Sequence, residues 1–117
     1  MKKILLIDDD NDNLHIITEV LTMKGFAVVA INQSISVEAV IELKPDLVIV
    51  DHYLTGQNGG DFCLKIKQNK QSEYLPVILI STGLNLKEIS EAGLADAFLA
   101  KPFNIDDLEN IAERFAL

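Results

Sequence analysis

Four short apolar runs, each followed directly by a polar residue, constrain the fold of this chain more than any other feature. The runs are Ile4–Ile7, Leu47–Val50, Val77–Ile80 and Ala97–Ala100. Short apolar runs that are separated by helical patterns are typical of parallel strands buried on both faces. The sequence therefore predicts an α/β domain built around a parallel sheet.

The polar residues that follow these runs have related chemistry. They are Asp8 and Asp9, Asp51, Ser81 and Lys101. Because the carboxyl ends of parallel strands lie on one edge of a sheet, where ligands bind, we expect these side chains to meet at a single site. Three carboxylates, a hydroxyl and an ammonium group suit a divalent cation together with a phosphoryl group.

Helical patterns separate the strands, and Ala27–Ile31 predicts a fifth strand. In the first helix, Leu14, Ile17 and Leu21 give one apolar face. The expected helices cover residues 13–24, a segment that begins at a cap at Ser34 or Ser36 and ends before Pro45, residues 61–68, residues 86–92, and a last segment capped by Asn104. The inward face of this last helix is expected to carry Ile105, Leu108, Ile111 or Ala112, and Phe115. Five such units form an open doubly wound sheet, since a barrel needs eight units and about 250 residues.

Length and composition indicate one cytoplasmic domain. The 117 residues suffice for a single core, and the net charge of −8 argues against nucleic-acid binding, which needs clustered Lys and Arg. No stretch approaches the ~20 apolar residues of a membrane span, and the run that ends at Ile7 is too short for a signal peptide. The single cysteine, Cys63, cannot form an internal disulfide, which fits a reducing compartment.

The acidic edge of the predicted sheet suggests specific chemistry. Carboxylates that lie close together repel one another, so a cluster of three raises its own pKa values or recruits a cation. Oxygen ligands favour Mg²⁺ or Mn²⁺ over zinc. Asp51 is the best candidate nucleophile, because carboxylates form acyl phosphates. Lys101 would offset charge on the transferring group, and Ser81 would hydrogen-bond one of its oxygens.

Each residue type also has a simpler interpretation. A lone Asp after a strand is usually a turn residue or a helix cap, and Asp10 and Asp12 fit such roles. A lone Ser usually caps the next helix, a lone Lys usually faces solvent, and His52 and Tyr53 suit an ordinary surface. The joint order Asp-Asp, Asp, Ser and Lys-Pro on consecutive buried strands is what favours a common site.

Taken together, these motifs resemble those of a receiver domain of two-component signalling, that is, of a response regulator, over essentially the whole chain. The matching segments are Ile4–Asp10, Pro45–Asp51, Pro76–Ser81 and Phe98–Phe103. The resemblance implies a flavodoxin-like sandwich with strand order 2-1-3-4-5. In that order the acidic residues lie at the switch point between the first and third strands.

The resemblance also implies roles for the site residues. Asp51 would accept a phosphoryl group from a sensor histidine kinase or a phosphotransfer protein. Asp9 would bind Mg²⁺ directly and Asp8 partly through water, with Asp51 and the backbone carbonyl of Tyr53 as further ligands. The chain would then change its binding to an unknown protein target, and its only catalysis would be its own phosphorylation and dephosphorylation.

Three further residues complete the implied mechanism. Lys101 would pair with the acidic cluster and the phosphoryl group, and its peptide bond to Pro102 would be cis. Ser81 would move toward the phosphoryl group, and Phe98 would change rotamer to fill the vacated space. Phosphorylation would thus be a local change in charge that shifts the balance between two conformations of the domain.

The chain departs from the family pattern at several positions. Thr55 stands where the family usually has Pro, in a loop that carries no catalytic side chain, and Thr82 replaces a small Ala after the switch hydroxyl. From Ser81 to Lys101 is about two positions shorter than the family spacing, so we expect a short or irregular fourth helix. Tyr53 is bulky beside the site, and we expect it to affect the lifetime of the phosphoryl group.

Two other functions fit parts of the pattern. A pseudo-receiver would bind partners without phosphate, and the short fourth helix favours it, whereas the complete acidic site argues against it. A haloacid-dehalogenase-type phosphohydrolase would use Asp8 and Asp10 as nucleophile and acid, but Asp51 would then have no role. Such an enzyme also needs a later acidic pair at a strand end, and Asp106-Asp107 instead begins a helix.

The predicted domain covers residues 1–117, with no output domain after Phe115. A stand-alone receiver and one module of a longer protein both fit the sequence. We expect a monomer or a weak homodimer, because the short fourth helix reduces the surface through which family members commonly dimerise.

Overall fold

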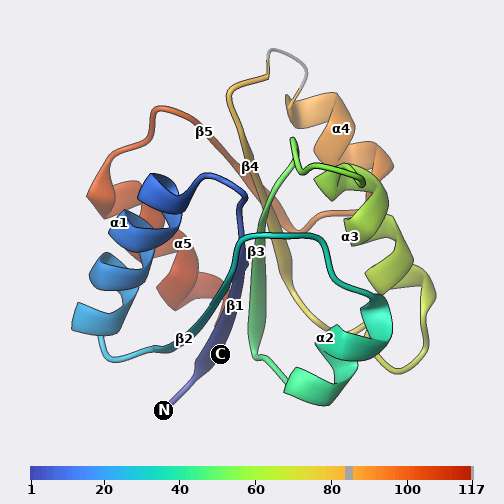
Figure 1. Ribbon diagram of the computed structural model, residues 1–117, viewed down its shortest axis with the longest axis horizontal. Helices are drawn as coiled ribbons and strands as arrows, with labels where there is room; N and C mark the ends of the chain where they lie inside the picture. The colour runs from blue at the N-terminus through green and yellow to red at the C-terminus, as the bar shows by residue number, and fades with distance from the viewer. Residues whose placement is uncertain (84–85, 117) are drawn as a thin grey trace.

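Five parallel strands form the centre of the computed structural model, which describes residues 1–83 and 86–116 (Figure 1). The sheet has the order β2-β1-β3-β4-β5, so the predicted fold class and strand order are confirmed. The strands are β1 (Lys3–Ile7), β2 (Ala27–Ile31), β3 (Leu47–Asp51), β4 (Val77–Ser81) and β5 (Ala97–Ala100). All pairings are parallel, which brings the carboxyl ends of the strands to one edge.

Helices cover both faces of the sheet. The helices are α1 (Asn11–Met23), α2 (Val37–Leu43), α3 (Gly59–Gln68), α4 (Leu86–Ala92) and α5 (Ile105–Phe115). Figure 1 shows α1 and α5 on one side and α2, α3 and α4 on the other. Within the described segments, no helix combines the length and the apolar character needed to cross a membrane.

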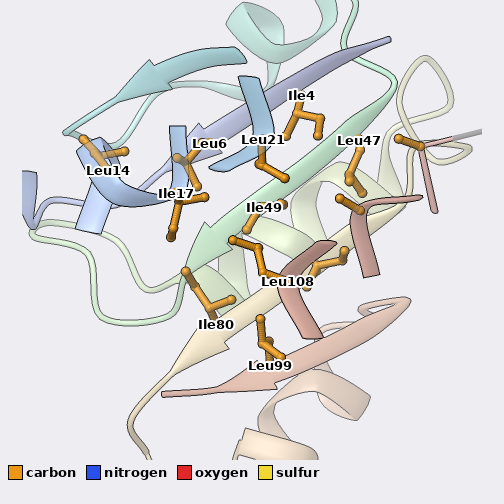
Figure 2. Packing of buried hydrophobic residues seen from close by; sticks show 13 residues of the cluster. Ile4, Leu6, Leu14, Ile17, Leu21, Leu47, Ile49, Ile80, Leu99 and Leu108 are labelled. Atoms are coloured by element: carbon orange, nitrogen blue, oxygen red, sulfur yellow. The ribbon is translucent and has the colours of Figure 1, made fainter. Parts of the chain in front are cut away.

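The core consists of two layers, because successive strand residues point to opposite faces. Ile4 and Leu6 of β1 pack toward α1 and α5, in the layer that Figure 2 shows, whereas Leu5 and Ile7 pack toward α2 and α3. All four side chains are fully buried, and burying one such side chain contributes about 1.5–3 kcal/mol. The strands are therefore fixed in register, and so are the residues that follow them.

Side-chain caps set the starts of four helices, and α5 begins after Asn104 as expected. Asp10 accepts hydrogen bonds from the backbone N–H groups of Asp12 and Asn13, so α1 begins at Asn11 rather than at residue 13. Asn58 caps α3 in the same way, and that helix begins at Gly59 rather than at residue 61. Of the two serines proposed to cap α2, Ser36 is the one that does so.

The prediction for the inward face of α5 is wrong at one position. Leu108 and Ala112 are buried as expected, and Phe115 packs against the same layer. Ile105, however, is 55% exposed. It is the first residue of α5, one turn before Leu108, and the buried stripe of the helix begins only at Leu108.

Candidate functional site

Three carboxylates meet at the carboxyl edge of the sheet. Asp8 directly follows β1 and Asp51 is the last residue of β3, and these two strands are neighbours with Ile7 opposite Val50. One carboxylate oxygen from each of Asp8, Asp9 and Asp51 lies within 4.8 Å of the others. Asp8 is fully buried and Asp51 is only 7% exposed, whereas Asp9 is exposed to solvent. The structure thus brings together the three acidic residues that the sequence placed at this edge.

Lys101 reaches the carboxylates from the end of β5. Its Nζ lies 2.9 Å from Oδ2 of Asp51 and 3.1 Å from Oδ2 of Asp8. Its backbone N–H donates to the carbonyl of Ser81 at 2.8 Å, which fixes the start of the loop after β5. The peptide bond between Lys101 and Pro102 is cis, as expected.

The remaining oxygens of the two buried carboxylates bind backbone donors. The N–H of Asp10 donates to Oδ1 of Asp8 at 2.9 Å, and the N–H of Tyr53 donates to Oδ1 of Asp51 at 3.1 Å. Each carboxylate therefore has one oxygen bound to the lysine and one bound to its own loop. These contacts set the orientation of both groups in the pocket.

Burial and charge shift the pKa values of two groups here. Loss of solvent raises the pKa of Asp8 above its usual range, and the negative charge of Asp51 adds to that rise, against the hydrogen bonds from Asp10 and Lys101. Burial alone would lower the pKa of Lys101. The hydrogen bonds that Lys101 donates to Asp51 and Asp8, together with their charges, outweigh that effect and raise its pKa. The lysine is therefore fully charged at neutral pH.

The donor set at this edge fits a hard divalent cation. It offers three carboxylates whose oxygens are close together, and among the described residues only Lys101 forms an ion pair with them. One lysine cannot balance three ionised carboxylates, and no nitrogen or sulfur ligand belongs to the group. Oxygen-only sites of this charge favour Mg²⁺ or Mn²⁺.

Ser81 lies at this edge, whereas Phe98 points largely outward. Ser81 is fully buried at the end of β4, and its Oγ accepts a hydrogen bond from the N–H of Gly83 at 3.0 Å. Ser81 pairs with Ala100, the residue before Lys101. Phe98 is 43% exposed on β5, opposite Leu79. The roles of Ser81 and Phe98 as switch residues remain predictions.

Two loop residues contribute more than the sequence indicated. Thr55 donates two hydrogen bonds to Oδ2 of Asp9, one from its N–H at 3.0 Å and one from its hydroxyl at 2.9 Å. His52 is half-buried, and its Nδ1 accepts from the N–H of Gly60 at 3.1 Å. The replacement of the usual Pro by Thr55 is the signal that could have indicated the first contact.

Two glycines between the end of β3 and the start of α3, Gly56 and Gly59, are needed for different reasons. Gly56 has a φ of 86°, which favours glycine. Gly59 is required for a different reason, because a Cβ at this position would collide with the carbonyl of Asp51. The start of α3 therefore lies directly against the end of β3.

The fourth helix is as short as expected. It spans seven residues, Leu86–Ala92, while residues 84 and 85 lie outside the described segments. Thr82 is exposed beside the buried Ser81. Tyr53 is 56% exposed, and a Cβ on Gly83 would collide with its phenol oxygen, so the Tyr53 side chain lies against the loop after β4.

The fold and the site define a class: a doubly wound α/β domain with an acidic, lysine-paired cluster at the carboxyl edge of its sheet. A family model described as the response regulator receiver domain matches residues 4–113. The chain belongs to this family of two-component signalling domains.

Individual relatives and solved structures agree with that assignment. The chain is 34% identical over 110 residues to the transcriptional regulatory protein CpxR of Klebsiella pneumoniae, covering 92% of this chain and 46% of that one. The receiver domain of NtrX from Brucella abortus is 32% identical with a TM-score of 0.83, covering 97% of each chain. The response regulator TrrA of Thermotoga maritima, solved in complex with Mg²⁺-BeF, is 25% identical with a TM-score of 0.82, covering 98% of this chain and 99% of that one.

The sequence matches cover most of this chain but a smaller share of the relatives. The chain spans about half the length of the curated relatives that it matches. The similarity to them therefore covers only about half of their length.

Proposed function

We propose that this chain is a phosphoacceptor switch that takes a phosphoryl group onto Asp51 in the presence of Mg²⁺. The observation that carries the proposal is the position of the Asp51 carboxylate. It lies at the sheet edge, 7% exposed, with a lysine ammonium at 2.9 Å and two further carboxylates beside it. A nucleophile in this setting reaches a donor from solvent while its surroundings offset the charge of the transferred group.

The chemical step is a transfer between a histidine of the partner and Asp51. A carboxylate oxygen of Asp51 attacks phosphorus, the new O–P bond forms, and the P–N bond breaks with its electron pair returning to the imidazole. Lys101 stabilises the negative charge that spreads over the phosphoryl oxygens. Asp8, Asp9 and Asp51 would hold Mg²⁺, with the backbone carbonyl of Tyr53 as a further ligand. A cation held by these residues would supply positive charge that offsets the charge of the transferred group.

The product changes the electrostatics around Ser81 and Phe98. The hydroxyl oxygen of Ser81 accepts from Gly83, and its O–H has no acceptor in the part of the chain that the structure describes, so it can donate to a phosphoryl oxygen on Asp51. Movement of Ser81 leaves room beside β5 for the ring of Phe98, which is now 43% exposed. The switch would alter the surface near β5 and α4 and thereby change the binding of a protein target.

The test is a phosphorylation assay with acetyl phosphate as a small donor. Wild-type protein with Mg²⁺ should gain one phosphoryl group by intact-protein mass spectrometry, and hydroxylamine should remove it, as expected for an acyl phosphate. Asp51→Asn should gain none. Asp12→Asn changes an exposed carboxylate in the first turn of α1 and should behave like wild type. A wild-type protein that gains no phosphoryl group at high donor and Mg²⁺ concentrations would refute the proposal.

A further inference from the structure

Thr55 connects the loop between β3 and α3 to the carboxylate of Asp9. Its backbone N–H and its hydroxyl both donate to Oδ2 of Asp9, at 3.0 and 2.9 Å. They are the two hydrogen bonds that the described residues give this carboxylate. The other oxygen of Asp9 accepts no hydrogen bond from residues 1–83 and 86–116 and can serve as a ligand.

A separate contact holds Thr55 in place. The hydroxyl of Ser34, in the loop after β2, donates to the carbonyl of Thr55 at 2.9 Å. Gly56 follows with a φ of 86° and turns the chain toward α3. The backbone of Thr55 is thus anchored independently of Asp9, so the donors are fixed and the carboxylate is oriented by them.

Asp9 needs such support more than its two neighbours do. Asp8 and Asp51 are buried and bound to Lys101 and to their own loops, whereas Asp9 is exposed. An exposed aspartate without partners samples several rotamers, and ordering it on metal binding costs entropy. Charge-assisted hydrogen bonds from a fixed loop remove that cost in advance.

We propose that Thr55 is a positioning residue for the cation site, holding Oδ2 of Asp9 so that its second oxygen is presented to Mg²⁺. This inference rests on the proposed function of the acidic edge. Hydrogen-bond partners of metal-binding carboxylates typically affect affinity by about 10- to 100-fold. The proline that the family usually has here supplies neither donor, so this chain uses a contact that the usual residue cannot make.

A series of substitutions at residue 55 separates the two donors. Thr55→Ser keeps both and should bind Mg²⁺ like wild type. Thr55→Val keeps the N–H and the branched shape but loses the hydroxyl, and should bind about 3- to 10-fold more weakly. Thr55→Pro loses both donors and should bind about 10- to 100-fold more weakly. Ser34→Ala should show a smaller loss, because it loosens the loop without removing a donor.

The experiment is a calorimetric titration of each 117-residue variant with MgCl₂, with urea unfolding in EDTA as a check on folding. Thr22→Val, a matched change at an exposed position of α1, should leave both readouts unchanged. If Thr55→Val bound Mg²⁺ with wild-type affinity, the inference would be wrong. Tighter Mg²⁺ binding by Thr55→Val would also overturn it, because it would show that the threonine competes with the cation for Asp9. The inference would also be overturned if wild type bound Mg²⁺ and Asp9→Asn bound it equally tightly. If the wild-type protein did not bind Mg²⁺ at all, the metal step of the proposed function would fail together with the inference about Thr55. The other outcomes overturn only the inference, so the two failures are distinguishable.

Discussion

The two edges of the sheet each contain a lysine bound to carboxylate, but the charge around them is balanced differently. At the amino edge, Nζ of Lys67 lies 2.7 Å from Oδ2 of Asp96 and donates to the carbonyl of Leu75, while the same aspartate oxygen accepts from the N–H of Val77. At the carboxyl edge, Lys101 faces two buried carboxylates and a third is close by. The group around Lys67 pairs one positive charge with one negative charge, whereas the group around Lys101 has a surplus of negative charge.

The difference separates a structural contact from a functional one. The group around Lys67 is complete, since each charge has an opposite partner and the remaining donors and acceptors are backbone groups that join α3, β4 and β5. The group around Lys101 holds more negative than positive charge, and burial, with a smaller contribution from the charge of Asp51, raises the pKa of Asp8. Proteins retain such unfavourable arrangements where a ligand relieves them. The comparison therefore predicts that divalent cations affect variants of the two lysines differently.

The largest effect is expected for Lys101→Met. In EDTA the variant should lose about 3 kcal/mol of stability, because Asp8 and Asp51 remain buried without their cationic partner. Saturating Mg²⁺ should reduce this deficit, since the cation binds the more negative site and stabilises the folded state. Urea unfolding with and without Mg²⁺ measures both. A deficit that Mg²⁺ leaves unchanged would show that the carboxyl edge does not behave as a cation site.

Lys67→Met should show a smaller and metal-independent loss. We expect about 1–2 kcal/mol, because the pair is partly buried and Asp96 keeps its bond from the N–H of Val77. The same urea experiment provides the measurement. If Mg²⁺ rescued this variant as well, the contrast between the two edges would be lost.

Asp8→Asn should stabilise the metal-free protein. Burial raises the folded-state pKa of Asp8 above its ordinary value of 3.8, so ionisation of Asp8 disfavours folding as the pH rises above 3.8, and this penalty is absent below that pH. At pH 7 in EDTA the variant should gain on the order of 1 kcal/mol after the loss of the Lys101 contact is included. The gain should shrink as the pH of the unfolding experiment falls toward 4. A gain that did not change across this pH range would contradict the raised pKa of Asp8 as its cause.

The smallest effect is expected at an exposed ion pair. Lys24 Nζ lies 2.8 Å from Oε1 of Glu113, and the hydrogen bond to Glu113 together with its charge raises the pKa of Lys24. The stabilisation from a raised lysine pKa is present at neutral pH and is lost only as the pH rises above 10.5 through the folded-state value. Because solvent screens this pair, Lys24→Met should lower the urea midpoint at pH 7 much less than Lys67→Met does. If Lys24→Met lost as much stability as Lys67→Met, burial would not explain the expected difference between these two ion pairs.

The strands and the acidic edge could be predicted because their signals are local. Each buried strand is a continuous apolar run, and the residue that follows it must lie at the sheet edge whatever its loop does afterwards. Helix starts were less certain, since they depend on single caps such as Asp10 and Asn58 whose side chains compete with other turn geometries. The exposure of Ile105 was not predicted, because periodicity shows which face of a helix is apolar but does not show how far along the helix the rest of the protein covers that face.

The sequence by itself determined the α/β class, the five strands and the residue types that gather at their carboxyl ends. The tertiary structure decided which oxygens of Asp8 and Asp51 face Lys101, and it alone placed Thr55 on Asp9. The reason is physical: burial patterns repeat over a few neighbouring residues, whereas the Thr55–Asp9 contact joins positions 46 apart and the Lys101–Asp8 contact joins positions 93 apart. Contacts at that separation form only once the packed sheet has fixed the ends of its strands.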